Sequence, residues 1–401
     1  MKFLLINQYF APDPAPTGQL LADVARALSA EGHSVEVLCS RSSYAAHDEV
    51  GGEELDGVKI RRLRGWSLGK GRLARLGSYG CFFLSALLHI VLGPRRDVIL
   101  TLTTPPLLAL AGTVGKRLRG ARHLIWEMDI YPDIAVEVGV IRAGGVIDRV
   151  IGALADFSRH QADELITLGR CMADRLQARG IPAAKINVAE NWADGDFVAP
   201  RPFPSGGPLV LLYSGNLGRA HDVETIAAAA QGLPHPERFR MIFAGGGRRR
   251  AQLEQACAGL RQMEFLPYQP HAALPHHLGR CHVGLVTQNA ATSGCVVPSK
   301  TYALMAAGRP FIFIGPRDAT PAHLIERFHC GWHVEPGNAV GLVALLEMLQ
   351  ARPELVQAAG ARARHAFLSY GGLPAGTARI VTVLTSRGLA PEPVKSATVK
   401  A

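Results

Sequence analysis

The sequence lacks the cysteine spacing of a disulfide framework or a zinc knuckle. Its seven cysteines are scattered, their number is odd, and no two of them form a CxxC pair. This usage is typical of a protein of a reducing compartment. A secretory signal peptide is not indicated either, because Asn7 and Gln8 end the apolar run that begins at Phe3. We therefore expect a buried first strand at this end and a cytoplasmic protein.

Long hydrophobic runs are also missing. A helix that spans a bilayer needs about 20 apolar residues. Residues 76–94 carry no charge, but their apolar part, from Cys81 to Leu92, is twelve residues long. Residues 98–115 are uncharged as well, yet Pro105 and Pro106 divide them into a strand and a helix. The sequence thus predicts no membrane-spanning segment.

Acidic residues are scarce in the second half of the chain. Residues 201–401 hold 20 basic and 11 acidic residues, whereas residues 1–200 hold 23 and 22. This positive excess favours an anionic ligand, such as a phosphate group, on the second half. Charged residues make up 19% of the chain and apolar residues 48%, which excludes a disordered protein.

Short apolar strands alternate with amphipathic helices, and this alternation stops and starts again once. It predicts βαβ units, and therefore an α/β protein with two doubly wound, Rossmann-like domains. The expected strands are 2–7, 34–39, 58–63, 97–102, 122–126, 164–168, 186–189, 209–214, 239–244, 282–287 and 310–314. The expected parts are a domain over 1–192, a linker over 193–208, a domain over 209–370, a final helix over 371–389 and a disordered tail over 390–401.

Two glycine-rich turns follow expected strands of the second domain. Gly215 and Asn216, with Arg219 close behind, lead from strand 209–214, and Gly245 and Gly246 close strand 239–244. Glycines let the backbone approach a phosphate, and a helix N-terminus supplies N–H donors. The pattern is neither GxGxxG nor a Walker loop, so a dinucleotide site is not indicated. The alternative is an ordinary tight turn between strand and helix.

A serine and a lysine open the helix that follows Pro298. Cations are disfavoured in the first turn of a helix, so Lys300 beside Ser299 is unusual. A bound anion would offset this repulsion. The alternative is a serine that caps the helix next to an exposed lysine.

Carboxylates gather after strand 122–126, where Glu127, Asp129 and Asp133 follow one another. One of them could act as a general base or stabilise positive charge, although loops also carry acids for solubility and capping. Ligands of open α/β sheets bind beyond the carboxyl ends of the strands, so two such edges predict a cleft between the domains. Asp194 and Asp196 have the form of a metal-binding Asp-x-Asp, but they lack a supporting His or Glu, and we predict a turn.

Residues 57–96 contain nine basic residues and no acidic one, and they enclose the apolar stretch from Cys81 to Leu92. Such a segment suits the face of an anionic membrane. Nucleic acid is the rival partner, but no recognised nucleic-acid fold accompanies the charges. The remaining alternative is a buried helix preceded by a solvated basic loop.

Six segments, in order, carry a resemblance to a known family: NQYFAPDPAPTGQLL, WEMDIYPD, ENWAD, YSGNLGRAHDVETI, FAGGG and VPSKTYALMAAGRP. They resemble the GT-B-fold glycosyltransferases of family 4, in the bacterial branch that builds O-antigen, capsule and colanic-acid-type polymers. The resemblance covers essentially the whole chain. It implies two facing α/β domains, an acceptor site on the first, a nucleotide-sugar site on the second, and C-terminal helices that cross back onto the first.

The resemblance also implies a chemistry. Enzymes of this kind retain the anomeric configuration, usually without a metal or other cofactor, and transfer a hexose or N-acetylhexosamine. We expect a nucleotide-diphosphate sugar, UDP-linked, as the donor. We expect a lipid-linked saccharide acceptor at the inner membrane face, approached through 57–96.

The implied roles fall on the motifs already described. Arg219, Lys300 and the backbone donors of Gly215 and Asn216 would stabilise the leaving diphosphate. The other donor-site residues would be Gly245, Gly246 and Ser299. Asp129, or alternatively Glu127, would orient or deprotonate the acceptor hydroxyl, and Thr17 and Gly18 would line the opposite wall of the cleft.

The sequence departs from the family at one point. Many members carry two glutamates in a Glu-x7-Glu pattern, and the corresponding residues here are Cys295 and Ala303. Ser299 and Lys300 are our candidates for part of their contacts. The departure keeps two other hypotheses open: a sugar-nucleotide epimerase on the same fold, and a non-catalytic relative that binds a sugar nucleotide or scaffolds an assembly.

Overall fold

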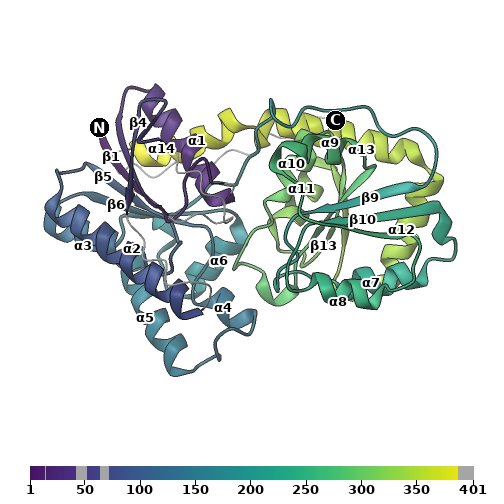
Figure 1. Cartoon of the computed structure of the whole chain (residues 1–401), viewed down its shortest axis with the longest axis horizontal. Helices are drawn as coiled ribbons and strands as arrows, with labels where there is room; N and C mark the ends of the chain where they lie inside the picture. The colour runs from purple at the N-terminus through teal and green to yellow at the C-terminus, as the bar shows by residue number, and fades with distance from the viewer. Residues whose placement is uncertain (14, 42–51, 64–71, 387–401) are drawn as a thin grey trace.

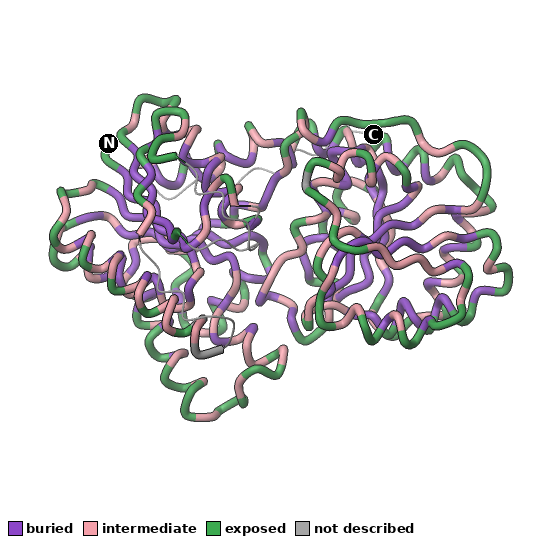
Figure 2. Tube along the Cα trace, viewed as in Figure 1, coloured by how far each residue is buried: buried purple, intermediate pink, exposed green. Residues whose placement is uncertain are grey.

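The structure, a computed structural model of the chain, describes residues 1–13, 15–41, 52–63 and 72–386. Two α/β domains lie side by side, each built around its own sheet (Figure 1). In both domains the central strands are buried, and most of the exposed surface lies on the outer sides of the helices and on the loops (Figure 2). The predicted α/β class with two doubly wound domains is confirmed.

The first sheet has eight strands in the order β3-β4-β2-β1-β5-β6-β7-β8. They pair in parallel except for β3 and β4. A parallel sheet is covered on both faces, so its strands are continuous apolar runs. The strands are β1 (Lys2–Ile6), β2 (Ser34–Ser40), β3 (Glu54–Leu55), β4 (Val58–Leu63), β5 (Val98–Thr101), β6 (Arg122–Glu127), β7 (Glu164–Thr167) and β8 (Ile186–Val188).

Alternate residues of β1 separate the helices into two layers. Phe3 and Leu5 belong to a core shared with α1, whereas Leu4 and Ile6 belong to a core shared with α2. Helix α3 packs beside both α2 and α5. The helices of this domain are α1 (Pro16–Ala30), α2 (Arg72–Leu92), α3 (Ala109–Arg119), α4 (Asp133–Glu137), α5 (Val146–Gln161) and α6 (Arg170–Ala178).

The second sheet is parallel throughout, in the order β11-β10-β9-β12-β13-β14. Its strands are β9 (Leu209–Ser214), β10 (Phe239–Ala244), β11 (Met263–Leu266), β12 (Val283–Thr287), β13 (Phe311–Ile314) and β14 (Gly331–Val334). The remaining helices are α7 (Glu224–Gly232), α8 (Arg250–Ala256), α9 (Leu274–Gly279), α10 (Lys300–Ala306), α11 (Thr320–Phe328), α12 (Ala339–Ala351), α13 (Pro353–Ala366) and α14 (Leu373–Thr385).

Helix α14 returns to the first domain and packs against α1 (Figure 1). Ile380 and Leu384 are fully buried in the first domain's core. Arg122 of β6 donates hydrogen bonds to the carbonyls of Val383 and Leu384, each at 3.0 Å. The final helix is thus part of the first domain's structure. The tail expected to be disordered lies outside the described residues.

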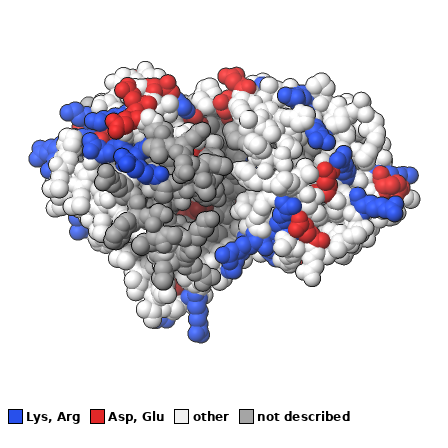
Figure 3. Space-filling view, viewed as in Figure 1, with Lys and Arg blue, Asp and Glu red and all other residues white. Residues whose placement is uncertain are grey.

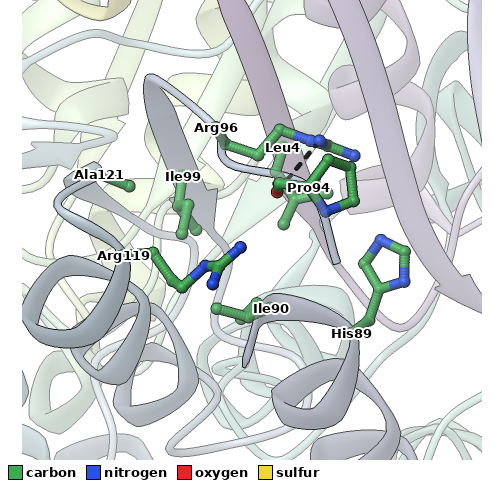
Figure 4. A pocket seen from close by; sticks show the side chains of 8 residues that line it. All are labelled: Leu4, His89, Ile90, Pro94, Arg96, Ile99, Arg119 and Ala121. Carbon is green, nitrogen blue, oxygen red and sulfur yellow. Dashed lines mark hydrogen bonds between the residues drawn. The ribbon is translucent and has the colours of Figure 1, made fainter. Parts of the chain in front are cut away.

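Buried charges fasten α2 to the sheet. Glu36 of β2 is 5% exposed and pairs with Arg96, with His89 at 3.4 Å and with Arg61 at 3.3 Å. Figure 4 shows His89, Arg96 and Arg119 around a small cavity beneath this end of α2. Burial alone would raise the pKa of Glu36, but His89 and Arg96 beside the carboxylate outweigh it and lower the pKa to about 2. Glu36 therefore stays ionised and holds Arg96, which follows α2.

We predict that Glu36→Gln lowers the free energy of unfolding at pH 7 by about 3 kcal/mol, because it leaves buried cations without a counter-charge. A carboxylate whose pKa is lowered by folding contributes stability above its unfolded pKa of 4.5 and loses it as the pH falls towards 2. The difference between the two proteins should therefore shrink over that interval. Urea unfolding measures it, with the exposed Glu31→Gln as the control, and equal stabilities at pH 7 would contradict the prediction.

Candidate active site

The two domains meet through loops at the carboxyl edges of their sheets. The backbone N–H of Ile130, after β6, donates to the carbonyl of Cys295 at 2.9 Å. Arg175 of α6 donates to the carbonyl of Ser293 at 3.1 Å, and Arg219 donates to the carbonyl of Val138 at 2.9 Å. The edges at which open α/β sheets bind ligands thus face each other.

Two glycine loops run against each other in the second domain. The N–H of Gly215 donates to the carbonyl of Ala244 at 2.8 Å, and the N–H of Leu217 donates to the carbonyl of Gly246 at 2.7 Å. Gly215 and Gly245 have φ angles of 129° and 138°, which side-chain-bearing residues rarely adopt. A Cβ at residue 245 would run into the carbonyl of Gly215. Glycine is therefore required for the two backbones to lie this close.

Lys300 lies against the first glycine loop, at the start of α10. Its Nζ donates to the hydroxyl of Tyr213 at 2.9 Å, and that hydroxyl donates to the carbonyl of Asn216 at 2.8 Å. A Cβ on Gly215 would come within 2.6 Å of Lys300 Cε. Burial lowers the pKa of Lys300 to about 8. Within the described ranges Lys300 has no carboxylate partner.

A cation without a counter-charge beside a glycine loop is a site prepared for an anion. Two of the predicted donor-site residues near Lys300 are accessible to a ligand. Ser299 is exposed and its side chain makes no capping hydrogen bond, and Gly246 has free space where a side chain would be. Asn216 is exposed as well. The structure therefore brings together the glycine loops and the start of α10, which are far apart in the sequence.

The arginines near the glycine loops are directed away from Lys300. Arg250 donates to the carbonyls of Gly245 and Leu266, and Arg249 pairs with Glu224, so both brace the second loop from outside. Arg219, predicted to contact the donor, reaches instead across the interface to Val138. This contact could not be predicted from the sequence, because the partner carbonyl belongs to the other domain.

The three carboxylates after β6 have different surroundings. Glu127 is buried and forms an ion pair with Arg159 of α5 at 2.7 Å, an arrangement that favours Asp129 over Glu127 as the predicted base. Asp133 pairs with Arg175 at 2.8 Å and with Arg179 at 3.1 Å. Both carboxylates are thus neutralised by arginines from the helices that follow.

Asp129 is the member of this group that has no ion-pair partner among the residues the structure describes. Its backbone N–H donates to the hydroxyl of Thr103 at 3.3 Å, which fixes the loop but leaves the carboxylate available. Burial, and secondarily the charge of Glu127, raise the pKa of Asp129 to about 6. A carboxyl group with such a pKa can accept and hold a proton near neutral pH.

Thr17 and Gly18 lie in the first turn of α1, beyond the carboxyl end of β1. The side-chain amide of Asn7 donates to the hydroxyl of Thr17 at 3.3 Å. A Cβ on Gly18 would meet the backbone of Tyr9 and Phe10 at 3.0 Å, so the helix start packs tightly on the loop after β1. In the sheet only β5 separates β1 from β6, which places both residues along the same edge as Asp129.

Cys295 and Ala303, where many family members have glutamates, take up different positions. Cys295 is fully buried at the domain interface, and burial raises the pKa of its thiol to about 12. The thiol lies within electrostatic reach of Arg175, Asp133 and Asp129. Ala303 packs against the core of the second domain.

No group of three or more His, Cys, Asp and Glu side chains within the described ranges is arranged to hold a metal ion. Asp194 accepts hydrogen bonds from the N–H groups of Asp196 and Phe197, at 2.9 and 3.1 Å, and so forms the predicted turn. Sequence reasoning missed Tyr213 and Arg159, since a tyrosine ending a strand and an arginine within a helix carry no distinctive motif.

Comparisons with known proteins agree with this architecture. Residues 17–192 match the glycosyl transferase 4-like domain family, and residues 199–366 match the glycosyl transferases group 1 family. The chain is 29% identical to the probable glycosyltransferase WbjE of Pseudomonas aeruginosa, over 63% of this chain and 66% of WbjE. It is 27% identical to the putative colanic acid biosynthesis glycosyl transferase WcaI of Escherichia coli (strain K12), over 86% of this chain and 91% of WcaI.

Solved structures share the fold at low sequence identity. Anabaena HepE in complex with UDP aligns with a TM-score of 0.68 and 14% identity, over 96% of this chain and 99% of HepE. HepE has also been solved with UDP-glucose. WaaG, a glycosyltransferase involved in lipopolysaccharide biosynthesis, aligns with a TM-score of 0.68 and 14% identity, over 96% of this chain and 100% of WaaG. The chain belongs to the GT-B-fold glycosyltransferases of family 4, the family that its motifs resemble.

Proposed function

We propose that the protein is a retaining glycosyltransferase of bacterial surface-polysaccharide synthesis. It would move a hexosyl or N-acetylhexosaminyl group from a nucleotide-diphosphate sugar, UDP-linked, to a lipid-linked saccharide. The observation that carries the proposal is Lys300, which lies beside two glycine loops and has no carboxylate partner among the described residues. UDP and UDP-glucose in HepE, and the names of WbjE and WcaI, support the donor class and the process.

The donor site would act on the leaving group. When the bond between the sugar C1 and the diphosphate oxygen breaks, negative charge grows on the diphosphate and positive charge on the sugar. Lys300 and the N–H groups of the loop at Gly215 and Asn216 would stabilise the diphosphate. Ser299, Gly245 and Gly246 would contact the rest of the donor. Arg219 would contribute to donor binding only after its hydrogen bond to the carbonyl of Val138 breaks. We propose that the transfer needs no metal.

The acceptor side would act through Asp129. The acceptor hydroxyl forms the new bond to C1, and its proton would pass to the Asp129 carboxylate, which is unpaired and has a raised pKa. Thr17 and Gly18 would border the acceptor along the same sheet edge.

An epimerase needs neither an acceptor site nor a lipid, and a non-catalytic relative would show no turnover.

Membrane proximity follows from a lipid-linked acceptor. The described part of the chain contains no helix that is both long and apolar enough to cross a membrane. We propose peripheral association at the inner face of the cell membrane. Two of the basic residues expected to serve it have internal partners, because Arg61 pairs with Glu36 and Arg62 donates to the carbonyl of Ala11 at 2.6 Å. Arg64 lies outside the described residues.

Incubation with UDP-sugars and an undecaprenyl-diphosphate-linked saccharide tests the proposal. We expect a lengthened lipid-linked product, with the donor's anomeric configuration retained in its NMR spectrum. An altered sugar nucleotide with no acceptor product would instead show an epimerase, and no turnover of any donor would favour the non-catalytic alternative.

We predict that Lys300→Met weakens UDP binding by about 10- to 150-fold, because charge-assisted hydrogen bonds contribute roughly 1.5–3 kcal/mol. Lys300 is protonated below its pKa of about 8, so the affinity of the unaltered protein should fall as the pH rises through 8. The variant should lose this pH dependence. Calorimetry measures both effects, with Arg261→Gln as the control that removes a positive charge elsewhere in the domain.

Arg219→Ala should weaken UDP binding less than Lys300→Met does. Equal affinities of the unaltered protein and Lys300→Met would remove the assignment of Lys300.

We predict that Asp129→Asn lowers the transfer rate by about 10²–10⁴-fold and leaves UDP affinity unchanged, because the amide cannot accept the proton. The carboxylate form is required, so the transfer rate of the unaltered protein should fall as the pH drops below about 6. The exposed Asp174→Asn serves as the control. A near-normal rate in Asp129→Asn would end this role.

A further inference from the structure

Helix α5 presents its large apolar side chains to the solvent. Val146, Ile147, Val150, Leu154 and Phe157 are all exposed, from 79% for Val146 to 39% for Leu154. Their spacing of one, four, eight and eleven residues from Val146 puts them on one side of the helix, and we refer to these five residues as the α5 ridge.

The side of α5 that packs on the domain is made of smaller or charged residues. Gly152, Ala155 and Ser158 are buried there, together with Arg159. A helix in a water-soluble domain normally buries its large apolar residues instead. Since α5 is held by small residues and by the Arg159–Glu127 ion pair, the ridge contributes little to the packing of the domain.

The apolar surface continues onto the neighbouring helices. Leu84, Leu88 and Leu92 of α2 are exposed, and so is Leu118 of α3, which packs beside both α2 and α5. The outer sides of α2 and α5 are exposed in Figure 2, and mainly uncharged side chains cover the tip of the domain around α5 in Figure 3. Large apolar side chains exposed on helices that pack beside one another are typical of an interaction site.

Charge favours one partner for this surface. Arg95, Arg117, Arg142 and Arg149 are exposed on or beside these helices, and no carboxylate in the described ranges pairs with them. The guanidinium of Arg117 lies over the ring of Phe157, 5.2 Å from its centre. Arginines among exposed apolar residues match the anionic headgroups and acyl chains of a bilayer. A second copy would instead bring arginines towards arginines.

We infer that the α5 ridge inserts into the surface of an anionic membrane, with the exposed leucines of α2 beside it. The inference builds on the lipid-linked acceptor proposed above. Helix α5 belongs to the same connection after β6 that carries Asp129 at the edge of the sheet where the acceptor would react, with α4 between them. Docking through this ridge would turn that edge towards the lipid.

Co-sedimentation with vesicles tests the inference. The full chain is mixed with vesicles of equal parts phosphatidylglycerol and phosphatidylcholine, and with vesicles of phosphatidylcholine alone. Replacing Val146, Ile147 and Val150 together by serine should lower binding to the anionic vesicles at least about tenfold, because three apolar side chains no longer enter the lipid. The matched control replaces Val340 and Leu368 by serine as well. These residues are 82% and 65% exposed in the second half of the chain, and this variant should bind like the unaltered protein.

Two further variants separate the possible causes. Val150→Trp should bind more tightly than the unaltered protein and keep its UDP affinity, a combination that misfolding does not produce. Arg61→Ala with Arg62→Ala should bind nearly normally, because both arginines have internal partners.

Three results would overturn the inference. They are absent or equal binding of the unaltered protein to the two vesicle types, normal binding of the serine variant, and a dimer in solution that the serine variant abolishes. UDP affinity is measured in parallel. If the unaltered protein binds vesicles but not UDP, the proposed function fails while the docking surface stands.

Discussion

The site depends on one ammonium group, which is held against a glycine loop with no carboxylate partner in the part of the chain that the structure describes. Lys300 can approach Gly215 only because that residue has no side chain, and its proton is directed to Tyr213, whose hydroxyl is anchored on Asn216. Burial without a carboxylate partner costs free energy and lowers the pKa of the lysine. A bound diphosphate would supply the missing negative charge and so offset this free-energy cost. The positive charge that destabilises the unliganded site would then be the main source of affinity for the donor.

A second constraint lies at the domain interface, where arginines of the first domain pair with two of the three carboxylates after β6. The third carboxylate remains available. Arg159, Arg175 and Arg179 neutralise Glu127 and Asp133, and Asp129 between them has no ion-pair partner within the described ranges. The same loop touches the second domain through Ile130 and the carbonyl of Cys295. A glutamate at residue 295 would bring another negative charge within reach of Asp129, so the uncharged thiol there keeps the charge balance of this interface. One loop, which follows β6, therefore sets both the position of Asp129 and a contact between the two domains.

Much of the fold could be predicted from the sequence, because buried parallel strands are short apolar runs and the helices between them are amphipathic. Three edge strands were missed. One is β3, which has only two residues, and the others are β11 and β14 of the second sheet, where half-buried polar residues such as Glu264 and His333 interrupt the apolar pattern. The glycine loops and Lys300 were found because their chemistry is local to each motif. The partner of Arg219 and the ion pair of Glu127 could not be found, since each joins segments far apart in the chain or in different domains.

The account rests on Lys300 being the cation that meets the diphosphate, and proton uptake on binding tests this most directly. At pH 8 about half of the Lys300 side chains should be neutral in the free protein, and a bound diphosphate should protonate nearly all of them. Calorimetry of UDP binding in buffers of different ionisation enthalpy counts these protons. We expect an uptake of about half a proton per UDP bound in the unaltered protein and none in Lys300→Met. UDP binding with no proton uptake, or with the same uptake in both proteins, would contradict the central claim.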